Sequence, residues 1–396
     1  MNVRDSEVIC GLLTTIPACR PGRDYRLTTN PDEADIVIFN TCSVRQHAED
    51  KVWSEIGRFA KLKQGKGQSP GGTVKKVKNL GDSPQKAGTV PIIGVIGCMA
   101  QNYAEEIFKR APRVDFVVGP SDIHKIPAII NKLSLARPAL YAAKIWETDS
   151  QIRPEEIYHT GFYQDKEHAF IVISEGCSNF CSYCLVPYVR GPLHNRNHRD
   201  ILKEIQEAVD KGITQFTLLG QNVNAYQYEG VNFVRLVRLV NLVKGLKGFS
   251  FITSHPKDTS IDLFKAIVDC DKLKKYLHLP VQAGSDRILE LMNRGYTRKF
   301  YLDLAQNYRK IVKGGLLTTD IIVGFTTEAE KDFRETFDLV NNMEFDSAYI
   351  FKYSPRPHTE AQKLKDDVTK EEKERRHKVI LELQKGISKK KGIKFK

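Results

Sequence analysis

The 396-residue sequence has no long hydrophobic run and no secretory start. No stretch reaches the ~20 apolar residues that a membrane-spanning helix needs. The first residues, MNVRDSEVIC, lack the basic and then apolar run of a signal peptide. These absences argue against a membrane or secreted protein, so we expect a cytoplasmic protein without a membrane partner. Because that compartment keeps thiols reduced, we expect the eight cysteines to be ligands, catalytic groups or buried small side chains rather than disulfides.

The chain also lacks an evenly spread charge, since two segments carry its whole net charge of +13. Residues 61–86 contain seven lysines against one aspartate, and residues 363–396 contain thirteen Lys or Arg against six acids. In the rest of the chain the positive and negative residues are equal in number, so the net charge says little about the surface of the folded domains. The basic C-terminal segment suits contacts with nucleic-acid phosphates, but a solvated helix with a lysine-rich end fits the same pattern.

Two arrays of alternating strand and helix patterns make up most of the chain. In the first array, residues 3–13 predict a helix, and three apolar runs predict buried strands of a parallel sheet: 34–40, 91–97 and 115–119. We place this α/β domain at residues 1–147. Within it, residues 66–88 are rich in Gly, Lys and Ser and have almost no apolar periodicity, which predicts a flexible insertion.

The second array repeats the strand and helix pattern six times. Its predicted strands are 169–174, 215–220, 249–253, 276–280, 318–324 and 347–354. Six such units predict a partial (β/α)6 barrel, placed at residues 160–360, with its chemistry at the carboxyl ends of the strands. Residues 361–396 then predict a basic helical tail.

Cysteines follow the predicted strands at both arrays. Cys177, Cys181 and Cys184 lie in EGCSNFCSYC after the first barrel strand, and Cys42 and Cys98 directly follow the first two N-terminal strands. Thiolates suit iron–sulfur clusters, and three of them leave one iron of a 4Fe–4S cluster open to a substrate or cofactor. Zinc with a fourth ligand from elsewhere is the alternative, although nothing nearby supplies that ligand at the usual spacing. Cys42 and Cys98 are expected at one edge of their sheet, where open α/β sheets bind ligands.

The CxxxCxxC spacing, with Tyr183 just before the last cysteine, resembles that of the radical S-adenosylmethionine (SAM) enzymes. Over nearly the whole chain, seven motifs in order resemble those of the MiaB-type tRNA methylthiotransferases: NTCSVRQHAEDKVWSEIGRF, GVIGCMAQ, EGCSNFCSYCLVPYVRG, LLGQNVNAY, TSHP, LHLPVQAGSDRILELMNRGYTR and TDIIVGF. Within that family, NTCSVR followed by AEDKV is similar to the branch that acts on isopentenyladenosine in tRNA.

The resemblance implies that the protein adds a methylthio group to C2 of N6-isopentenyladenosine at position 37 of tRNA, beside the anticodon. It implies a radical 4Fe–4S cluster on Cys177, Cys181 and Cys184, with SAM bound to it near Tyr183. It also implies an auxiliary 4Fe–4S cluster, for which Cys42 and Cys98 match two of three ligands. The expected partners are tRNA and an electron donor such as flavodoxin or ferredoxin, and the expected state is a monomer.

Polar residues at the ends of the barrel strands extend this expected site. Six of them are predicted to surround the cofactor and the base: Gln221, Asn222, Ser254, His255, Gln282 and Asp320. Each of them also fits a role as a loop cap. Arg190 and Arg196 follow the cysteine loop and are predicted to contact tRNA phosphates, with a surface salt bridge as the alternative.

The sequence departs from the family pattern in four places. The family's first auxiliary-cluster cysteine would fall two residues before Met1, and its C-terminal TRAM β-barrel would follow GIKFK, so we expect both to be missing. GFTTEAE stands where the family has Pro-Gly after GF, and residues 66–88 are inserted. Cys10 and Cys270 are interpreted as packed small side chains. Cys10 and Cys19 lie near the position of the missing cysteine in the sequence, and a role as substitute ligand stays open for them. Other functions remain open at this point: a catalytically silent iron–sulfur protein that binds tRNA, or a methylthiotransferase for threonylcarbamoyladenosine tRNA or a ribosomal protein.

Overall fold

The computed structural model describes residues 1–15, 25–30, 33–43, 46–65, 91–135, 144–148 and 152–392. The predicted insertion at 66–88 and Cys19 lie outside these residues. The chain divides into two compact units, Asn2–Phe162 and Tyr163–Lys396. Among the helices in the described ranges, none is long and apolar enough to cross a lipid bilayer.

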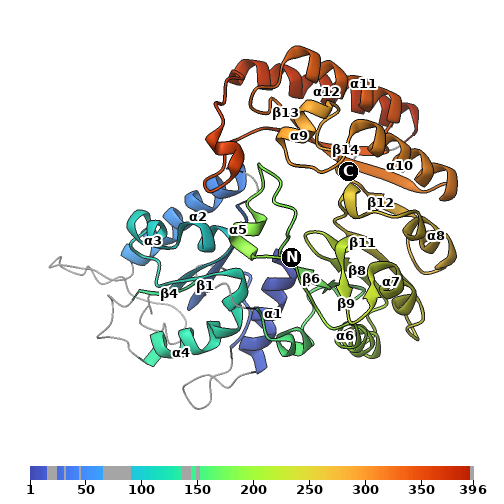
Figure 1. The fold of residues 1–396 in the computed structure, drawn as a ribbon. Helices are drawn as coiled ribbons and strands as arrows, with labels where there is room; N and C mark the ends of the chain where they lie inside the picture. The colour runs from blue at the N-terminus through green and yellow to red at the C-terminus, as the bar shows by residue number, and fades with distance from the viewer. Residues whose placement is uncertain are drawn as a thin grey trace. The chain divides into compact units, whose positions relative to one another are not determined.

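The first unit is built on a four-stranded parallel sheet (Figure 1). Its strands lie in chain order: β1 (Ile36–Thr41), β2 (Ile92–Gly97), β3 (Phe116–Val118) and β4 (Ile145–Glu147). The three predicted strands and their parallel arrangement are therefore confirmed. The prediction missed β4, a three-residue edge strand whose Trp146 is 54% exposed and which has no run of buried apolar residues.

Four helices flank this sheet: α1 (Asn2–Thr15), α2 (Gln46–Gly65), α3 (Cys98–Arg110) and α4 (Ile126–Leu135). The short helices η2 (Pro120–Lys125) and η3 (Glu155–Thr160) complete the unit. Two buried arginines tie residues 152–162 to it. Arg4 of α1 donates to the backbone carbonyls of Tyr158 and Phe162, and Arg153 pairs with Asp5 at 2.7 Å. The segment after residue 147 is thus anchored to the first unit.

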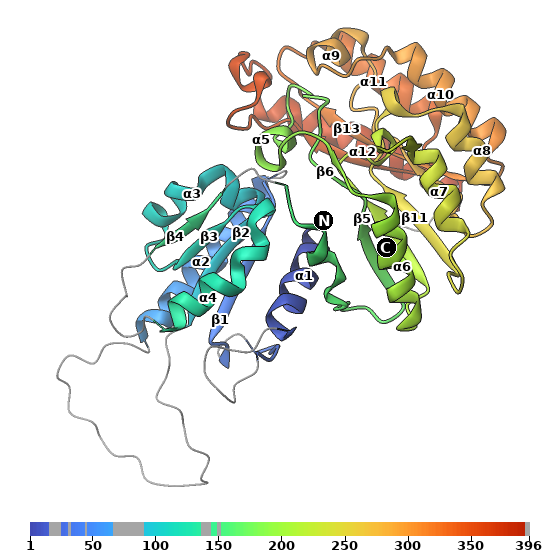
Figure 2. The same cartoon turned by 60° about the horizontal axis from the view of Figure 1, so that its bottom comes forward.

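The second unit is a partial (β/α)6 barrel, as predicted (Figures 1 and 2). All six predicted strands are present: β5 (His168–Val172), β8 (Gln215–Leu219), β11 (Gly248–Ile252), β12 (Tyr276–His278), β13 (Leu316–Val323) and β14 (Ser347–Lys352). They form two parallel sheets, β11-β8-β5 and β12-β13-β14, which a parallel bridge between Phe249 and Leu273 connects. Two short antiparallel pairs are β6 (Ser174–Glu175) with β7 (His194–Asn195) and β9 (Gln227–Tyr228) with β10 (Val231–Asn232).

Helices cover the outer side of the barrel strands (Figure 2). They are α6 (His198–Asp210), α7 (Phe233–Asn241), α8 (Ile261–Asp269), α9 (Asp286–Leu291), α10 (Arg298–Ile311), α11 (Glu330–Met343) and α12 (Lys370–Lys390), with α5 (Val186–Arg190), η4 (Val223–Ala225), η5 (Pro256–Asp258) and η6 (Glu360–Lys363) in the connections. A polar residue before five of these helices accepts a hydrogen bond from a backbone N–H of the first turn: Asn197, Asn232, Ser260, Thr297 and Thr369. Each such cap typically stabilises a helix by about 1 kcal/mol, which explains where these helices begin.

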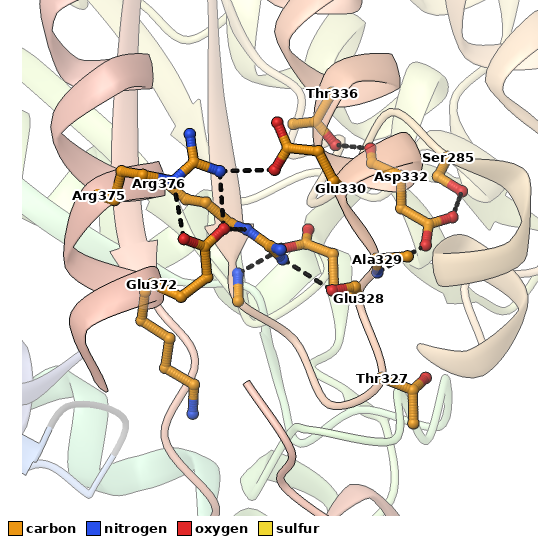
Figure 3. A network of polar contacts seen from close by, with 12 residues as sticks. Ser285, Thr327, Glu328, Ala329, Glu330, Asp332, Thr336, Glu372, Arg375 and Arg376 are labelled. Carbon is orange, nitrogen blue, oxygen red and sulfur yellow. Dashed lines mark hydrogen bonds and ion pairs between the residues drawn. The ribbon is translucent and has the colours of Figure 1, made fainter. Parts of the chain in front are cut away.

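The basic helix predicted after residue 361 is present as α12, but one of its faces is buried. Ile380 and Ile387 belong to the barrel core, and Gln384 donates to the carbonyl of Phe345. Arg376 is 5% exposed and pairs with the buried Glu328 in the loop after β13 (Figure 3). The segment is therefore neither a solvated helix nor a free arm, because part of its positive charge is paired inside the second unit.

The loop after β13 contains a threonine in a backbone conformation that favours glycine. Thr327 has a φ of 61°, at the position where the family resemblance leads us to expect glycine. A β-branched side chain is strained in this region. The Thr327 carbonyl and hydroxyl accept hydrogen bonds from Arg287, so the loop keeps its shape despite the strain.

Thr327→Gly is expected to raise the free energy of unfolding by about 1 kcal/mol, because glycine adopts this φ without a steric cost. Urea unfolding measures the change. Thr326→Gly is the matched control: Thr326 is buried, has no positive φ and donates to the carbonyl of Lys365, so its replacement should destabilise the protein. Equal destabilisation by both changes would show that Thr327 is not strained.

Candidate functional site

The three predicted cluster cysteines share one loop at the end of the first barrel strand. The β6–β7 pair closes this loop at its base. Gly176 has a φ of 70°, and a Cβ there would lie 2.1 Å from the carbonyl oxygen of Pro192, so the loop can close only over a glycine. The N–H of Cys177 donates to the carbonyl of Gly191 at 3.1 Å across the same base.

Backbone hydrogen bonds from other segments hold the middle of the loop. Ser182 donates through its N–H to Met292 and through its hydroxyl to Leu291, at 3.0 and 2.7 Å. The N–H of Ala361 donates to the carbonyl of Ser182 at 2.7 Å. The N–H of Cys184 donates to the carbonyl of Cys181 at 2.9 Å, which makes a tight turn between these two cysteines. The spacing of the thiols is thus set by the protein backbone.

Burial raises the pKa of the Cys177 thiol and raises that of Cys184 to about 12. Both thiols are therefore protonated without a metal, and ligation of a cluster iron would release their protons. Within the described ranges, no three His, Cys, Asp or Glu side chains are placed to hold a single metal ion.

Buried polar atoms without hydrogen-bond partners surround the mouth of the barrel. In the part of the chain that the structure describes, they include Ser174 Oγ, Gln221 Oε1, Asn222 Oδ1, Ser254 Oγ and His255 Nε2. They lie at the ends of β5, β8 and β11, where four of them were predicted as cofactor contacts. Buried polar groups are nearly always hydrogen-bonded in proteins, so this group fits a polar ligand such as SAM.

His255 presents a hydrogen-bond donor to this mouth. Its Nδ1 accepts the backbone N–H of Lys257 at 3.2 Å. Burial, followed by the charges of Arg294 and Lys257, lowers the pKa of His255 to about 2, so the ring is neutral. The proton of the neutral ring therefore sits on Nε2, the buried atom without a partner.

Asp258 was not predicted, yet it connects the cysteine loop with the end of β8. Its carboxylate accepts from the amide of Asn222 at 2.6 Å and from that of Asn179 at 3.4 Å. The amide of Asn222 is thereby fixed, which leaves its Oδ1 as an acceptor for a ligand. The only sequence signal is the position of Asp258 two residues after the TSHP motif.

Of the two remaining predicted contacts, Gln282 lies beyond the end of β12 (Tyr276–His278), whereas Asp320 lies inside β13 (Leu316–Val323) and not, as was predicted, at a strand end. Gln282 has a φ of 74°, is 8% exposed and forms a parallel bridge with Ile321. Asp320 lies within β13, and its carboxylate is 3.3 Å from Nε2 of His278, a partner that the sequence did not indicate. The role of both residues as cofactor contacts stays a prediction.

The structure does not support the predicted phosphate contact of Arg196. This side chain is 2% exposed and pairs with Glu204 at 2.6 Å and Asp200 at 2.5 Å, both on α6. It also donates to the carbonyl of Val172. Arg196 therefore joins α6 to the end of β5. Arg190 is the half-buried last residue of α5, and its contact with tRNA stays a prediction.

Cys42 and Cys98 lie at one edge of the first unit's sheet, as expected. Thr41 and Gly97 are paired in the β1–β2 register, so the next residue on each strand is one of the two cysteines. Gly97 has a φ of 90°, and a Cβ there would lie 2.5 Å from the carbonyl oxygen of Thr41. Ser43 Oγ and both side-chain polar atoms of Asn102 are buried without a hydrogen-bond partner. This edge therefore also fits a polar or ionic group.

Cys10 and Cys270 lie on other elements than the two groups of cysteines described above. Cys10 is half-buried on α1, and Cys270, 4% exposed, belongs to the apolar core of the barrel. This position supports the interpretation of Cys270 as a small packed side chain.

Comparison with known proteins identifies both units. Residues 171–340 match the model of the Radical SAM superfamily, and residues 1–119 match that of the Uncharacterized protein family UPF0004. A tRNA-2-methylthio-N(6)-dimethylallyladenosine synthase of Moorella thermoacetica is 39% identical over 98% of this chain and 81% of its own length. Enzymes of the same name from Clostridium perfringens and Hydrogenobaculum are 40% and 36% identical over 100% of this chain and 81% and 84% of their own lengths.

The fold also matches solved structures. The cobalamin-dependent SAM radical enzyme OxsB superposes with a TM-score of 0.50 and 12% identity, covering 90% of this chain and 48% of that chain. At this identity the match concerns the fold alone. It agrees with the partial barrel described above.

Proposed function

Since the chain belongs to the family of tRNA-2-methylthio-N(6)-dimethylallyladenosine synthases, which are radical SAM methylthiotransferases, we propose that it adds a methylthio group to C2 of N6-isopentenyladenosine at position 37 of tRNA. One observation carries the proposal: three thiols share a preformed loop at the mouth of the barrel, beside buried polar atoms that lack partners. The arrangement offers ligands for a cluster and contacts for SAM in one place.

The proposal assigns the residues to two groups. Cys177, Cys181 and Cys184 hold the radical 4Fe–4S cluster, and Cys42 and Cys98 are ligands of the auxiliary 4Fe–4S cluster. When bound, the radical cluster supplies the electron that cleaves SAM to a 5′-deoxyadenosyl radical, which activates the unreactive C2 position. The proposal includes a low-potential donor of the flavodoxin or ferredoxin type and a monomeric enzyme.

The protein's own side chains orient the bound cofactor. His255 offers an N–H donor, whereas Gln221 and Asn222 offer carbonyl oxygens as acceptors, and the Ser254 hydroxyl serves as either. Because these atoms are buried, their hydrogen bonds to a ligand are stronger than the same bonds in water. They fix its position without moving the strands that carry them.

Nucleoside mass spectrometry tests the proposal. Reconstituted protein, SAM and a one-electron reductant are incubated with tRNA that contains N6-isopentenyladenosine, and we expect 2-methylthio-N6-isopentenyladenosine. Cys98→Ala is expected to abolish this product while 5′-deoxyadenosine still forms, because the radical site lies in the other unit.

Two parallel incubations with other substrates can contradict the proposal. One contains tRNA with threonylcarbamoyladenosine, and the other contains ribosomal protein. Modification of either in place of isopentenyladenosine tRNA would contradict the proposed substrate. Binding of tRNA without any methylthiolation would favour a catalytically silent protein.

A further inference from the structure

Arg294, which follows α9, is a buried cation beside the cysteine loop. It is 4% exposed. Its Nη1 donates to the sulfur of Cys181 at 3.2 Å and to the hydroxyl of Tyr183 at 3.3 Å. Its Nη2 donates to the carbonyl of Pro280, and its Nε donates to the hydroxyl of Tyr296, both at 2.9 Å. The guanidinium is thus held in place from several sides, with one edge against a proposed cluster ligand.

This arginine has no carboxylate partner among the described residues. All its hydrogen-bond acceptors are hydroxyl or carbonyl oxygens or the Cys181 sulfur. Four other buried arginines do pair with a carboxylate: Arg4 with Glu7, Arg153 with Asp5, Arg196 with Glu204 and Arg376 with Glu328. Burying a cation without a counter-ion greatly lowers the stability of a protein, so we expect an anion to bind next to this guanidinium.

We propose that Arg294 is a positioning residue that pairs with the Cys181 thiolate and raises the reduction potential of the radical cluster. The inference depends on the proposed function, which makes Cys181 a cluster ligand. Hydrogen bonds to ligand sulfurs and nearby charge are known determinants of cluster potential. The guanidinium stays protonated, so reduction adds one electron to the cluster and moves no proton. The positive charge offsets part of the cost of adding that electron.

The test measures the cluster potential directly. In a Cys42→Ala/Cys98→Ala background only the radical cluster remains, and about four irons per chain would confirm its assembly. Redox titration with dithionite, followed by electron paramagnetic resonance, gives the midpoint potential.

For Arg294→Gln we expect the equilibrium constant for reduction of the cluster to fall at least tenfold, which lowers the midpoint potential by about 59 mV for a one-electron couple. Arg294→Lys keeps the charge and should shift the potential less. Arg287→Gln is the matched control: among the described residues, the hydrogen-bond partners of the Arg287 side chain are Asp332 and Thr327 and not a cysteine, so this change should leave the potential unchanged.

A second measurement does not depend on the stability of any variant. Protein labelled with 15N-arginine should show a 15N hyperfine coupling to the reduced cluster, before and after SAM is added. An unchanged potential in an Arg294→Gln protein with four irons, or the absence of this coupling, would overturn the inference. Loss of the coupling on addition of SAM would also overturn it, because Arg294 would then bind the SAM carboxylate. If the protein with all its cysteines bound no iron, the proposed function would be overturned as well.

Discussion

Replacing Cys181 by alanine is expected to abolish the formation of 5′-deoxyadenosine from SAM. Cys181 is the most buried of the three loop cysteines and the one that contacts Arg294. The remaining pair of thiolates cannot hold a 4Fe–4S cluster with one open iron. Chromatography of the nucleosides after reduction with dithionite measures the product, and iron analysis shows whether the cluster has been lost.

Cys270→Ala is the matched control for this experiment. Cys270 is also buried in the second unit, but it belongs to the apolar core. Its replacement should cost some stability and leave both iron content and 5′-deoxyadenosine formation intact. Persistent 5′-deoxyadenosine formation by Cys181→Ala, at the rate of this control, would refute the cluster assignment.

Replacing Arg376 by alanine is expected to destabilise the second unit by about 3–5 kcal/mol. The change leaves the carboxylate of Glu328 buried, with the N–H of Gly324 as its main remaining partner. An uncompensated buried charge costs far more than the loss of a surface pair. Urea unfolding followed by circular dichroism measures the difference from the parent protein.

The adjacent Arg375 provides the control (Figure 3). Arg375 also pairs with carboxylates, Glu330 and Glu372, but its side chain is 46% exposed. Arg375→Ala should therefore cost about 1 kcal/mol or less. The double variant Arg376→Met/Glu328→Gln should recover much of the lost stability. Equal effects of the two single changes would mean that water reaches Glu328 and that α12 is not anchored there.

The barrel could be predicted from the sequence because most of its strand residues are apolar. Each of the six strands appears as a short apolar run between helical patterns, and each was found close to its observed bounds. The strand β4 was missed because an edge strand needs no such run. Strand ends also indicated where the cysteine loop and the buried polar atoms without partners lie, since parallel strands bring their carboxyl ends to one side of the barrel.

The buried charged residues of the fold could not be predicted from patterns within short stretches of the sequence. On α12 the buried face includes Lys373, Arg376 and Gln384, so hydrophobic periodicity suggests a solvated helix. Glu328, the carboxylate partner of Arg376, lies 48 residues away in the sequence, and Cys181, the sulfur partner of Arg294, lies 113 residues away. Arg196 did carry a signal: Asp200 and Glu204 follow it at intervals of four residues, the spacing of one helix face.

The backbone anchoring of the cysteine loop bears on how the protein survives oxidative damage. Ser182 of the loop is hydrogen-bonded to Leu291, Met292 and Ala361, so the loop loses its conformational entropy when the barrel folds and not when metal binds. A cluster destroyed by oxygen would leave its thiols in place, as long as they are not themselves oxidised beyond reversal. Repair would then require new iron and sulfide but no new protein synthesis. We therefore expect the lifetime of this polypeptide in the cell to exceed that of any cluster it carries.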